Sequence, residues 1–382
     1  MPRVSVKPEL LHWARERAGR SVEDLHGRFK NLAAWEQGES QPTFKQLEDF
    51  AKATHVPFGY LFLPEPPEER IPMPDLRTVK NEEISRPSPD LLDTIYLMQR
   101  RQAWLREEMI DCESEPLDLV GSVHIADDAE GVGRKMRQVL GLNDNWAEAI
   151  STWSSAVRKL LSSIEELGVM AFINGIVNNS TNRKLNVLEF RGFALSDKYA
   201  PLVFVNGADA KSAQMFTLAH ELAHILLGKS ALSNTGLASQ QAQGIELWCD
   251  LVAAEFLVPA EHLRERWPEF KNKEDPFSSI SRIFKVSPIV VGRRAKDLRL
   301  IDDETFFNFY EEYIARDHDS STDSKGGNFY YNQNTRVGKK FYTQIIHAAT
   351  AGRLSFKEAY RLTGLNGNAF QKYGQFLEIN LP

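Results

Sequence analysis

One stretch of the chain must fold as a helix that is buried on nearly every side. In FTLAHELAHILLG (residues 216–228), the only ionisable groups are His220, Glu221 and His224. Burying such groups costs several kcal/mol unless they are hydrogen-bonded or hold a metal. Because positions four residues apart share one face of a helix, the two imidazoles can reach the same point in space. The fold must therefore bring suitable partners to this helix from elsewhere in the chain.

A second apolar stretch can supply those partners. IELWCDLVAAEFLVP (245–259) carries Glu246 and Asp250, again four residues apart, on an otherwise apolar helix. One carboxylate can ligate zinc, while the other accepts the N–H of a ligand histidine. Paired helical histidines and paired acids are often only hydrogen-bonded or solvated, but the apolar surroundings of both pairs favour a metal site. Cys249 lies at a different helical angle from Glu246, and we interpret it as a small core thiol.

The two stretches together resemble the ImmA/IrrE family of metallopeptidases. They combine H-E-x-x-H with a following E-x-x-x-D, the ligand arrangement of gluzincin peptidases. The preceding run RGFALSDKYAPLVFVNGADAKSAQMF (191–216) is also similar to that family, and the resemblance covers about residues 150–300. The chain departs from the family in having Cys249 where alanine is common and Asp250 where asparagine is common.

The resemblance implies a role for each of these residues. Zn²⁺ would be held by His220, His224 and Glu246, and Asp250 would orient a ligand histidine. Glu221 would act as general base and proton shuttle in the hydrolysis of a peptide bond.

Other residues near these stretches invite weaker interpretations. The strand expected over residues 201–206 would offer an edge on which an extended peptide can pair. Tyr199 and His262 could donate hydrogen bonds to an oxyanion, but we interpret both as structural.

Composition sets the class of protein and its compartment. With 382 residues, 42% hydrophobic and 26% charged, the chain has the balance of a globular protein with several domains. No apolar run is long enough to span a bilayer and the N-terminus lacks an apolar signal region, so we expect no membrane partner. Cys112 and Cys249 imply no disulfide framework, and a reducing cytoplasm is expected. The net charge of −6 argues against a general polyanion-binding protein.

We expect a mainly α fold with a small β-sheet (α+β), in which a zincin-like peptidase core is flanked by helical domains. Residues 169–175 and 200–207 predict strands, and residues 129–167 predict a helix. The expected domains are a shortened XRE-like helix-turn-helix (1–63), a Pro-rich linker (64–88), the peptidase domain (89–275), a helix-turn-helix-like segment (276–315), a flexible connection (316–328) and a small C-terminal helical domain (329–382).

Two segments raise the question of DNA binding. The first 63 residues resemble an XRE-type helix-turn-helix, but Ser21 to Pro42 is about four residues shorter than usual, at the turn and the start of the recognition helix. These residues hold nine Lys/Arg against eight Asp/Glu, a weak phosphate-binding footprint. Residues 20–45 could contact DNA, or they could belong to a scaffold that docks a partner. Residues 278–300 have a similar shape with a basic face, which we favour as scaffold. The face comprises Arg293, Arg294, Lys296 and Arg299.

The sequence thus predicts a cytoplasmic zinc endopeptidase coupled to a DNA-binding-like domain. By resemblance, its substrate would be a repressor or another regulatory protein, of the kind encoded nearby in a toxin–antitoxin or phage-related module. One alternative is a DNA-binding regulator or antitoxin whose zinc site is structural or sensory, and another is an interaction module without catalysis. Glu221 separates these hypotheses, because a structural zinc site needs no glutamate beside its first ligand.

Overall fold

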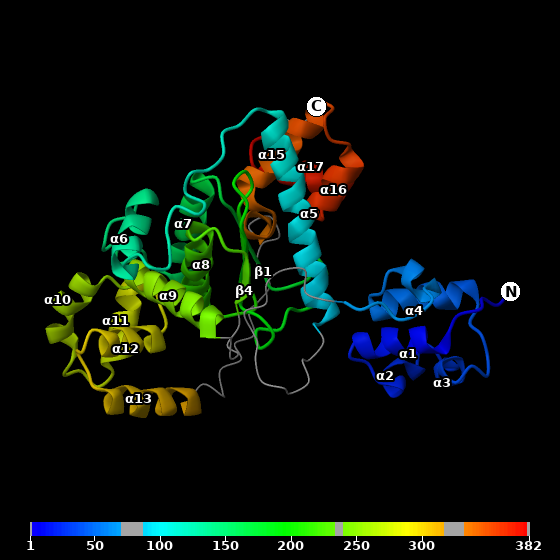
Figure 1. Ribbon diagram of the computed structural model, residues 1–382, viewed down its shortest axis with the longest axis horizontal. Helices are drawn as coiled ribbons and strands as arrows, with labels where there is room; N and C mark the ends of the chain where they lie inside the picture. The colour runs from blue at the N-terminus through cyan, green and yellow to red at the C-terminus, as the bar shows by residue number, and fades with distance from the viewer. Residues whose placement is uncertain (1, 70–86, 234–239, 317–331, 380–382) are drawn as a thin grey trace. The chain divides into compact units, whose positions relative to one another are not determined.

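The computed structural model describes residues 2–69, 87–233, 240–316 and 332–379 (Figure 1). Contacts divide these residues into two compact units, the first built from residues 2–69 and 87–96 and the second from residue 97 onward. Most of the expected linker (64–88) and connection (316–328) lies outside the described residues. None of the described helices combines the length and hydropathy that crossing a bilayer requires.

The first unit is a bundle of short helices around an aromatic core. Ser21 begins its second helix with a capping box: the Asp24 amide donates to Ser21 Oγ (3.1 Å) and the Ser21 amide donates to Asp24 Oδ2 (2.9 Å). Phe44 is 55% exposed, and its ring packs edge-on against Phe58. The elements are α1 (Pro8–Arg17), α2 (Val22–His26), α3 (Leu32–Glu36), α4 (Phe44–Thr54) and the 3-10 turn η1 (Phe58–Phe62).

The second unit is built on a small mixed sheet. Its strands are β1 (Met170–Asn174), β2 (Gly192–Leu195), β3 (Leu202–Asn206) and β4 (Ala231–Ser233). Their order is β1-β3-β2-β4, with β1 parallel to β3 and the other neighbours antiparallel. The expected strands β1 and β3 are confirmed, whereas β2 and β4 were not predicted. The expectation that 201–206 forms an edge is wrong, because β3 pairs on both sides; β4 ends the sheet instead.

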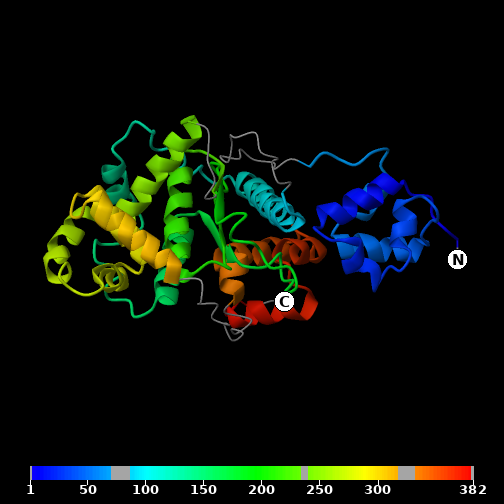
Figure 2. The ribbon, with the colours of Figure 1, turned by 90° about the horizontal axis from the view of Figure 1, so that it is seen from below.

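Helices cover both faces of this sheet, as Figures 1 and 2 show. On one face, small and branched side chains such as Ala171, Val203 and Ala194 join the core formed with α7 and α8. On the other face, Phe172, Phe204 and Phe193 are cross-strand neighbours. Phe341 of α15 meets Phe172 there, with ring centroids 5.8 Å apart. Because successive side chains of a strand point to opposite faces of the sheet, each strand contributes to two hydrophobic cores, one on each face.

Helices make up the remainder of the described second unit. The predicted helix over 129–167 is wrong in its middle, because Gly141 has a φ of +65° that ends one helix and Thr152 caps the next. The helices are α5 (Pro89–Asp111), α6 (Ala129–Val139), α7 (Trp153–Glu166), α8 (Lys211–Leu226), α9 (Gln240–Leu257), α10 (Ala260–Phe270), α11 (Pro276–Phe284), α12 (Pro288–Asp297), α13 (Asp303–Arg316), the π-helical turn η3 (Asn334–Gly338), α15 (Lys339–Thr350), α16 (Phe356–Thr363) and α17 (Gly367–Phe376).

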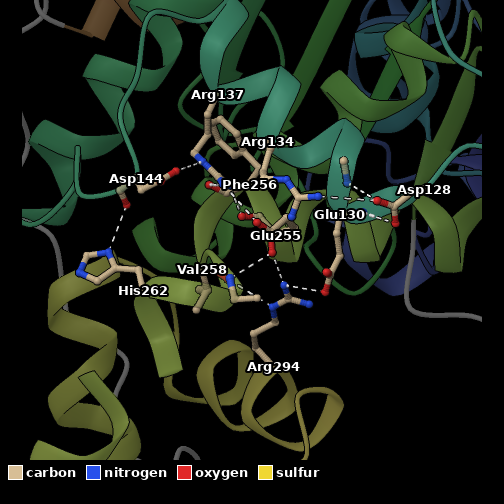
Figure 3. Close-up of polar contacts among 12 residues, drawn as sticks. Asp128, Glu130, Arg134, Arg137, Asp144, Glu255, Phe256, Val258, His262 and Arg294 are labelled. Atoms are coloured by element: carbon tan, nitrogen blue, oxygen red, sulfur yellow. Dashed lines mark hydrogen bonds and ion pairs between the residues drawn. The ribbon is translucent and has the colours of Figure 1, made fainter. Parts of the chain in front are cut away.

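A buried ion cluster anchors the C-terminal end of α9 (Figure 3). Glu255 lies between Arg137 of α6 and Arg294 of α12, and each of the three side chains is 2% exposed. Arg137 Nη2 donates to Glu255 Oε1 at 3.1 Å, and Arg294 pairs with Glu255 Oε2. Arg137 also donates to Asp144 Oδ1 (2.8 Å), and Arg294 Nε donates to the carbonyl oxygen of Val258 (3.2 Å). Positive charge thus meets the negative end of the helix dipole of α9.

This cluster includes one of the arginines that the sequence had assigned to the basic face of segment 278–300. Arg294, predicted to belong to a basic surface, is buried inside the core, while its neighbour Arg293 is exposed. Lys296 Nζ pairs with Asp303 Oδ1 at 3.2 Å. Helices α11 and α12 therefore use part of their positive charge to pack the domain, in line with the scaffold interpretation.

The two neighbouring arginines provide a matched test. Arg294→Met leaves the buried Glu255 carboxylate with one cation fewer, so we expect the free energy of unfolding to fall by about 3–5 kcal/mol. Arg293→Met removes the same charge from an exposed position, where we expect a change of about 0.5 kcal/mol or less. Urea denaturation of both variants measures the difference. Similar losses in the two variants would contradict the buried cluster.

Candidate metal centre

Helix α8 holds both histidines in the centre of the second unit. It packs against α7, α9, β2 and β3, which explains why its sequence is apolar on nearly every side. His220 is 5% exposed, and His224 and Glu221 are 0% exposed. The prediction of a buried helix is confirmed, and these polar groups therefore require partners.

Helix α9 brings the third candidate ligand to the histidines. The Nε2 atoms of His220 and His224 lie 3.1 Å apart. Glu246 Oε2 lies 3.2 Å from His220 Nε2, and Glu246 Oε1 lies 3.0 Å from His224 Nε2. Ligand atoms bound tetrahedrally at zinc distances lie about 3.3 Å from one another. Two imidazoles and one carboxylate thus converge, with one ligand atom from each residue within 4.8 Å of the others, and this donor set fits a zinc ion.

Asp250 fixes the orientation of the first histidine. His220 Nδ1 and Asp250 Oδ1 lie 3.0 Å apart. Because an ionised carboxylate can only accept, His220 must donate its Nδ1 proton, so Nε2 is the ring atom that can bind a metal once it is deprotonated. His224 Nδ1 is buried without a hydrogen-bond partner in the described part of the chain. The two histidines are therefore held differently: Asp250 fixes the Nδ1 side of His220, whereas the Nδ1 side of His224 is held by packing among the described residues.

The pKa values of these side chains depend on two opposing effects, burial and the contacts described above. Burial disfavours the charged form of His220, but the bonds to Asp250 and Glu246 outweigh it and hold its pKa well above the usual value. Burial lowers the pKa of His224 despite Glu246. Burial raises the pKa of Glu246, but its bonds to the two histidines outweigh burial and lower it to about 2. The cluster thus holds its carboxylate ionised and one imidazole protonated, and a metal ion would have to displace that proton.

Glu221 lies against strand β2, at a point where only glycine fits. A Cβ atom at Gly192 would lie 2.9 Å from Glu221 Oε1, 2.5 Å from Thr217 Cγ2 and 2.8 Å from the Phe204 carbonyl oxygen. Both carboxylate oxygens of Glu221 are buried. The glutamate therefore occupies a tight space beside the sheet, one residue along α8 from His220. Sequence reasoning missed Gly192, whose only signal was a glycine at the start of a short apolar run.

The edge strand β4 runs close to this point. Ser233 of β4 pairs with Gly192 of β2, the residue that contacts Glu221. On α8, Phe216 is partly exposed, and its ring centroid lies 6.3 Å from that of His220. Among the described residues, the strand that ends this side of the sheet and an aromatic ring thus lie near the convergent side chains.

The two weaker candidates lie elsewhere. Tyr199 follows β2 in the turn to β3, at the end of the strand opposite Gly192, and its amide donates to Asp197 Oδ1 at 2.8 Å. The Nδ1 atom of His262 lies 3.3 Å from the carbonyl oxygen of Asp144, and its ring packs edge-on against Phe284. These contacts agree with the structural interpretation of both residues.

Comparisons with known proteins bear on this centre and on the C-terminal helices. Residues 165–296 match the family model of the IrrE N-terminal-like domain, Peptidase_M78. The match contains α8 and α9 and supports both the resemblance to the ImmA/IrrE family and a metallopeptidase-like function for this segment. Residues 337–376 match a domain of unknown function, DUF8813. No curated protein matches the chain.

The contact between β2 and α8 can be tested by adding one methyl group. Gly192→Ala forces a Cβ atom against Thr217, Phe204 and Glu221, so we expect the free energy of unfolding to fall by about 1–3 kcal/mol. Gly367→Ala is the control, because a Cβ atom at that position would meet nothing within 4 Å. Urea unfolding measures both variants. Equal stability of the two would show that the strand and helix are packed less closely than described.

Proposed function

We propose that the protein is a zinc-dependent endopeptidase whose metal ligands are His220, His224 and Glu246. The observation that carries the proposal is the convergence of one ligand atom from each of these residues, all within 4.8 Å of one another, beside a buried glutamate. A bound zinc ion would supply Lewis acidity, which makes a water acidic near neutral pH and polarises a carbonyl group. The match to a peptidase family over the same residues supports this chemistry.

The roles of the other residues follow from their positions. Glu221 would take the proton of the attacking water and deliver it to the leaving amine, because it lies next to His220 in a buried space. Gly192 holds that space open. Asp250 would keep His220 in the tautomer that binds metal, and so acts as a positioning residue.

Strand β4 is the surface on which we propose that the substrate binds. An extended peptide can add to an open sheet edge through backbone hydrogen bonds, and β4 ends the sheet beside the strand that contacts Glu221. The peptide would lie antiparallel or parallel to β4, one strand away from Gly192. This replaces the interior strand β3 that the sequence had suggested.

The substrate we propose is a regulatory protein, by analogy with the family that this segment resembles. That residues 20–45 bind DNA is a hypothesis that rests on the sequence alone. Helix α3, which would correspond to the recognition helix, has five residues, and Ala33 and Gln37 are exposed on or just after it. A DNA-binding regulator with a structural or sensory zinc site is the alternative, and the role of Glu221 distinguishes the two.

Metal content tests the ligand set without any substrate. Glu246→Ala should lose stoichiometric zinc, and Asp250→Ala should bind zinc about 10–100-fold more weakly because His220 loses its orienting partner. Glu261→Ala, an exposed carboxylate on α10, is the control and should keep its zinc. Elemental analysis after dialysis against a chelating buffer provides the measurement. Full zinc retention by Glu246→Ala would remove this residue from the ligand set.

Catalysis is tested by changing Glu221 alone. Glu221→Gln keeps the size of the side chain but cannot take a proton, so we expect zinc to remain bound and cleavage to fall at least about 100-fold. The substrates are a proteome-derived peptide library and each protein encoded beside the gene, with new termini counted by mass spectrometry. If the zinc-loaded wild type cuts neither, the zinc site is structural or sensory.

A further inference from the structure

Helix α13 carries apolar side chains on two neighbouring faces. The inner face packs on the rest of the unit: Phe306 is 8% exposed, and the ring of Phe309 lies 4.3 Å from that of Phe277 on α11. The outer face carries Phe307, Tyr310 and Ile314, which are 54%, 37% and 42% exposed. The helix therefore has a second apolar stripe that its own packing does not use.

The spacing of the outer stripe is that of a helix-binding surface. Phe307, Tyr310 and Ile314 stand at i, i+3 and i+7, so they follow one line along the helix. Single exposed apolar residues are ordinary, but three large ones in a row form a patch of the kind found at protein interfaces. In Figure 1, α13 lies at the periphery of the second unit, beyond α12, against which it packs.

The charge of α13 determines what can cover this stripe. Glu304 and Glu311 stand three residues before and four residues after Phe307, so both exposed carboxylates border the stripe. The helix carries four acidic residues and one arginine in all. This surface repels nucleic acid and anionic membranes, and it disfavours pairing with the same acidic face of a second copy.

The chain itself shows that a lysine fits here. Lys296 of α12 pairs with Asp303 at the start of α13, with 3.2 Å between Nζ and Oδ1. The same ammonium lies 5.4 Å from the centroid of the Phe307 ring, a cation–π contact. An aromatic ring beside a carboxylate thus already holds one cation at this end of the stripe. Glu311, one turn beyond Phe307, offers the next carboxylate along the same edge.

We propose that α13 is a docking surface for a basic amphipathic helix of a partner protein. The apolar side chains of that helix would pack on Phe307, Tyr310 and Ile314, while its flanking lysines or arginines would pair with Glu304 and Glu311. The surface is separate from the candidate metal centre, and its function does not depend on catalysis.

The test uses two synthetic amphipathic helices with the same leucine stripe, one flanked by lysines and the other by glutamates. We expect the full chain to bind the lysine-flanked peptide at least about tenfold more tightly, as measured by fluorescence anisotropy. The double variant Phe307→Ser/Ile314→Ser should weaken that binding about tenfold or more. Glu304→Lys/Glu311→Lys should reverse the preference between the two peptides.

A control variant separates this surface from general stickiness. Ile110→Ser/Val139→Ser removes two other apolar residues, which are 41% and 46% exposed, and should leave peptide binding unchanged. Circular dichroism establishes that each variant is folded. The proposal is overturned if the lysine-flanked peptide fails to bind at about millimolar concentration, or if the stripe and control variants bind it equally. It is also overturned if the stripe variant abolishes a dimer in sedimentation analysis, because the occupant would then be a second copy.

Discussion

The structure of the candidate centre depends on the packing of α9 against α8. His220 and His224 are set by one helix alone, but Glu246 and Asp250 reach them only if α9 lies at the right height and rotation. The buried pairing of Glu255 with Arg137 and Arg294 holds the far end of α9 to α6 and α12. Gly133 of α6 lets the two helices approach, since a Cβ atom there would lie 2.8 Å from Glu255. The buried carboxylate of Glu255 therefore helps to place that of Glu246, about two and a half turns away along the same helix.

The sheet imposes a second constraint on the same centre. Its two faces carry separate cores, and the strand β2 that contacts α8 does so at Gly192, where the backbone must approach closely. Glu221 thus lies between a helix and a strand, beside the pairing of β2 with β4. The positions of Glu221 and of strand β4 are linked because both lie beside this one strand.

Local patterns predicted the parts of the protein whose cause is local. The apolar helix of His220 and the strands β1 and β3 were predictable from residue order, because each reflects helical or strand periodicity. The break between α6 and α7 was also encoded locally, in Gly141 and Thr152, but the apolar spacing on either side masked it. Arg294 was wrongly predicted to lie on a basic surface. Its ion pair with the buried Glu255 joins two helices, and the order of residues does not show such a long-range contact.

What the sequence by itself determined is the set of groups that require one another: two histidines, a glutamate and an acidic pair, all on helices too apolar to leave them in water. Only the tertiary structure decided that His220, His224 and Glu246 converge, that β3 is interior while β1 and β4 end the described sheet, and that Gly192 makes room for Glu221. The reason is physical. Periodicity sets which face a side chain lies on, whereas the distance between two faces depends on packing and pairing between segments far apart in the chain.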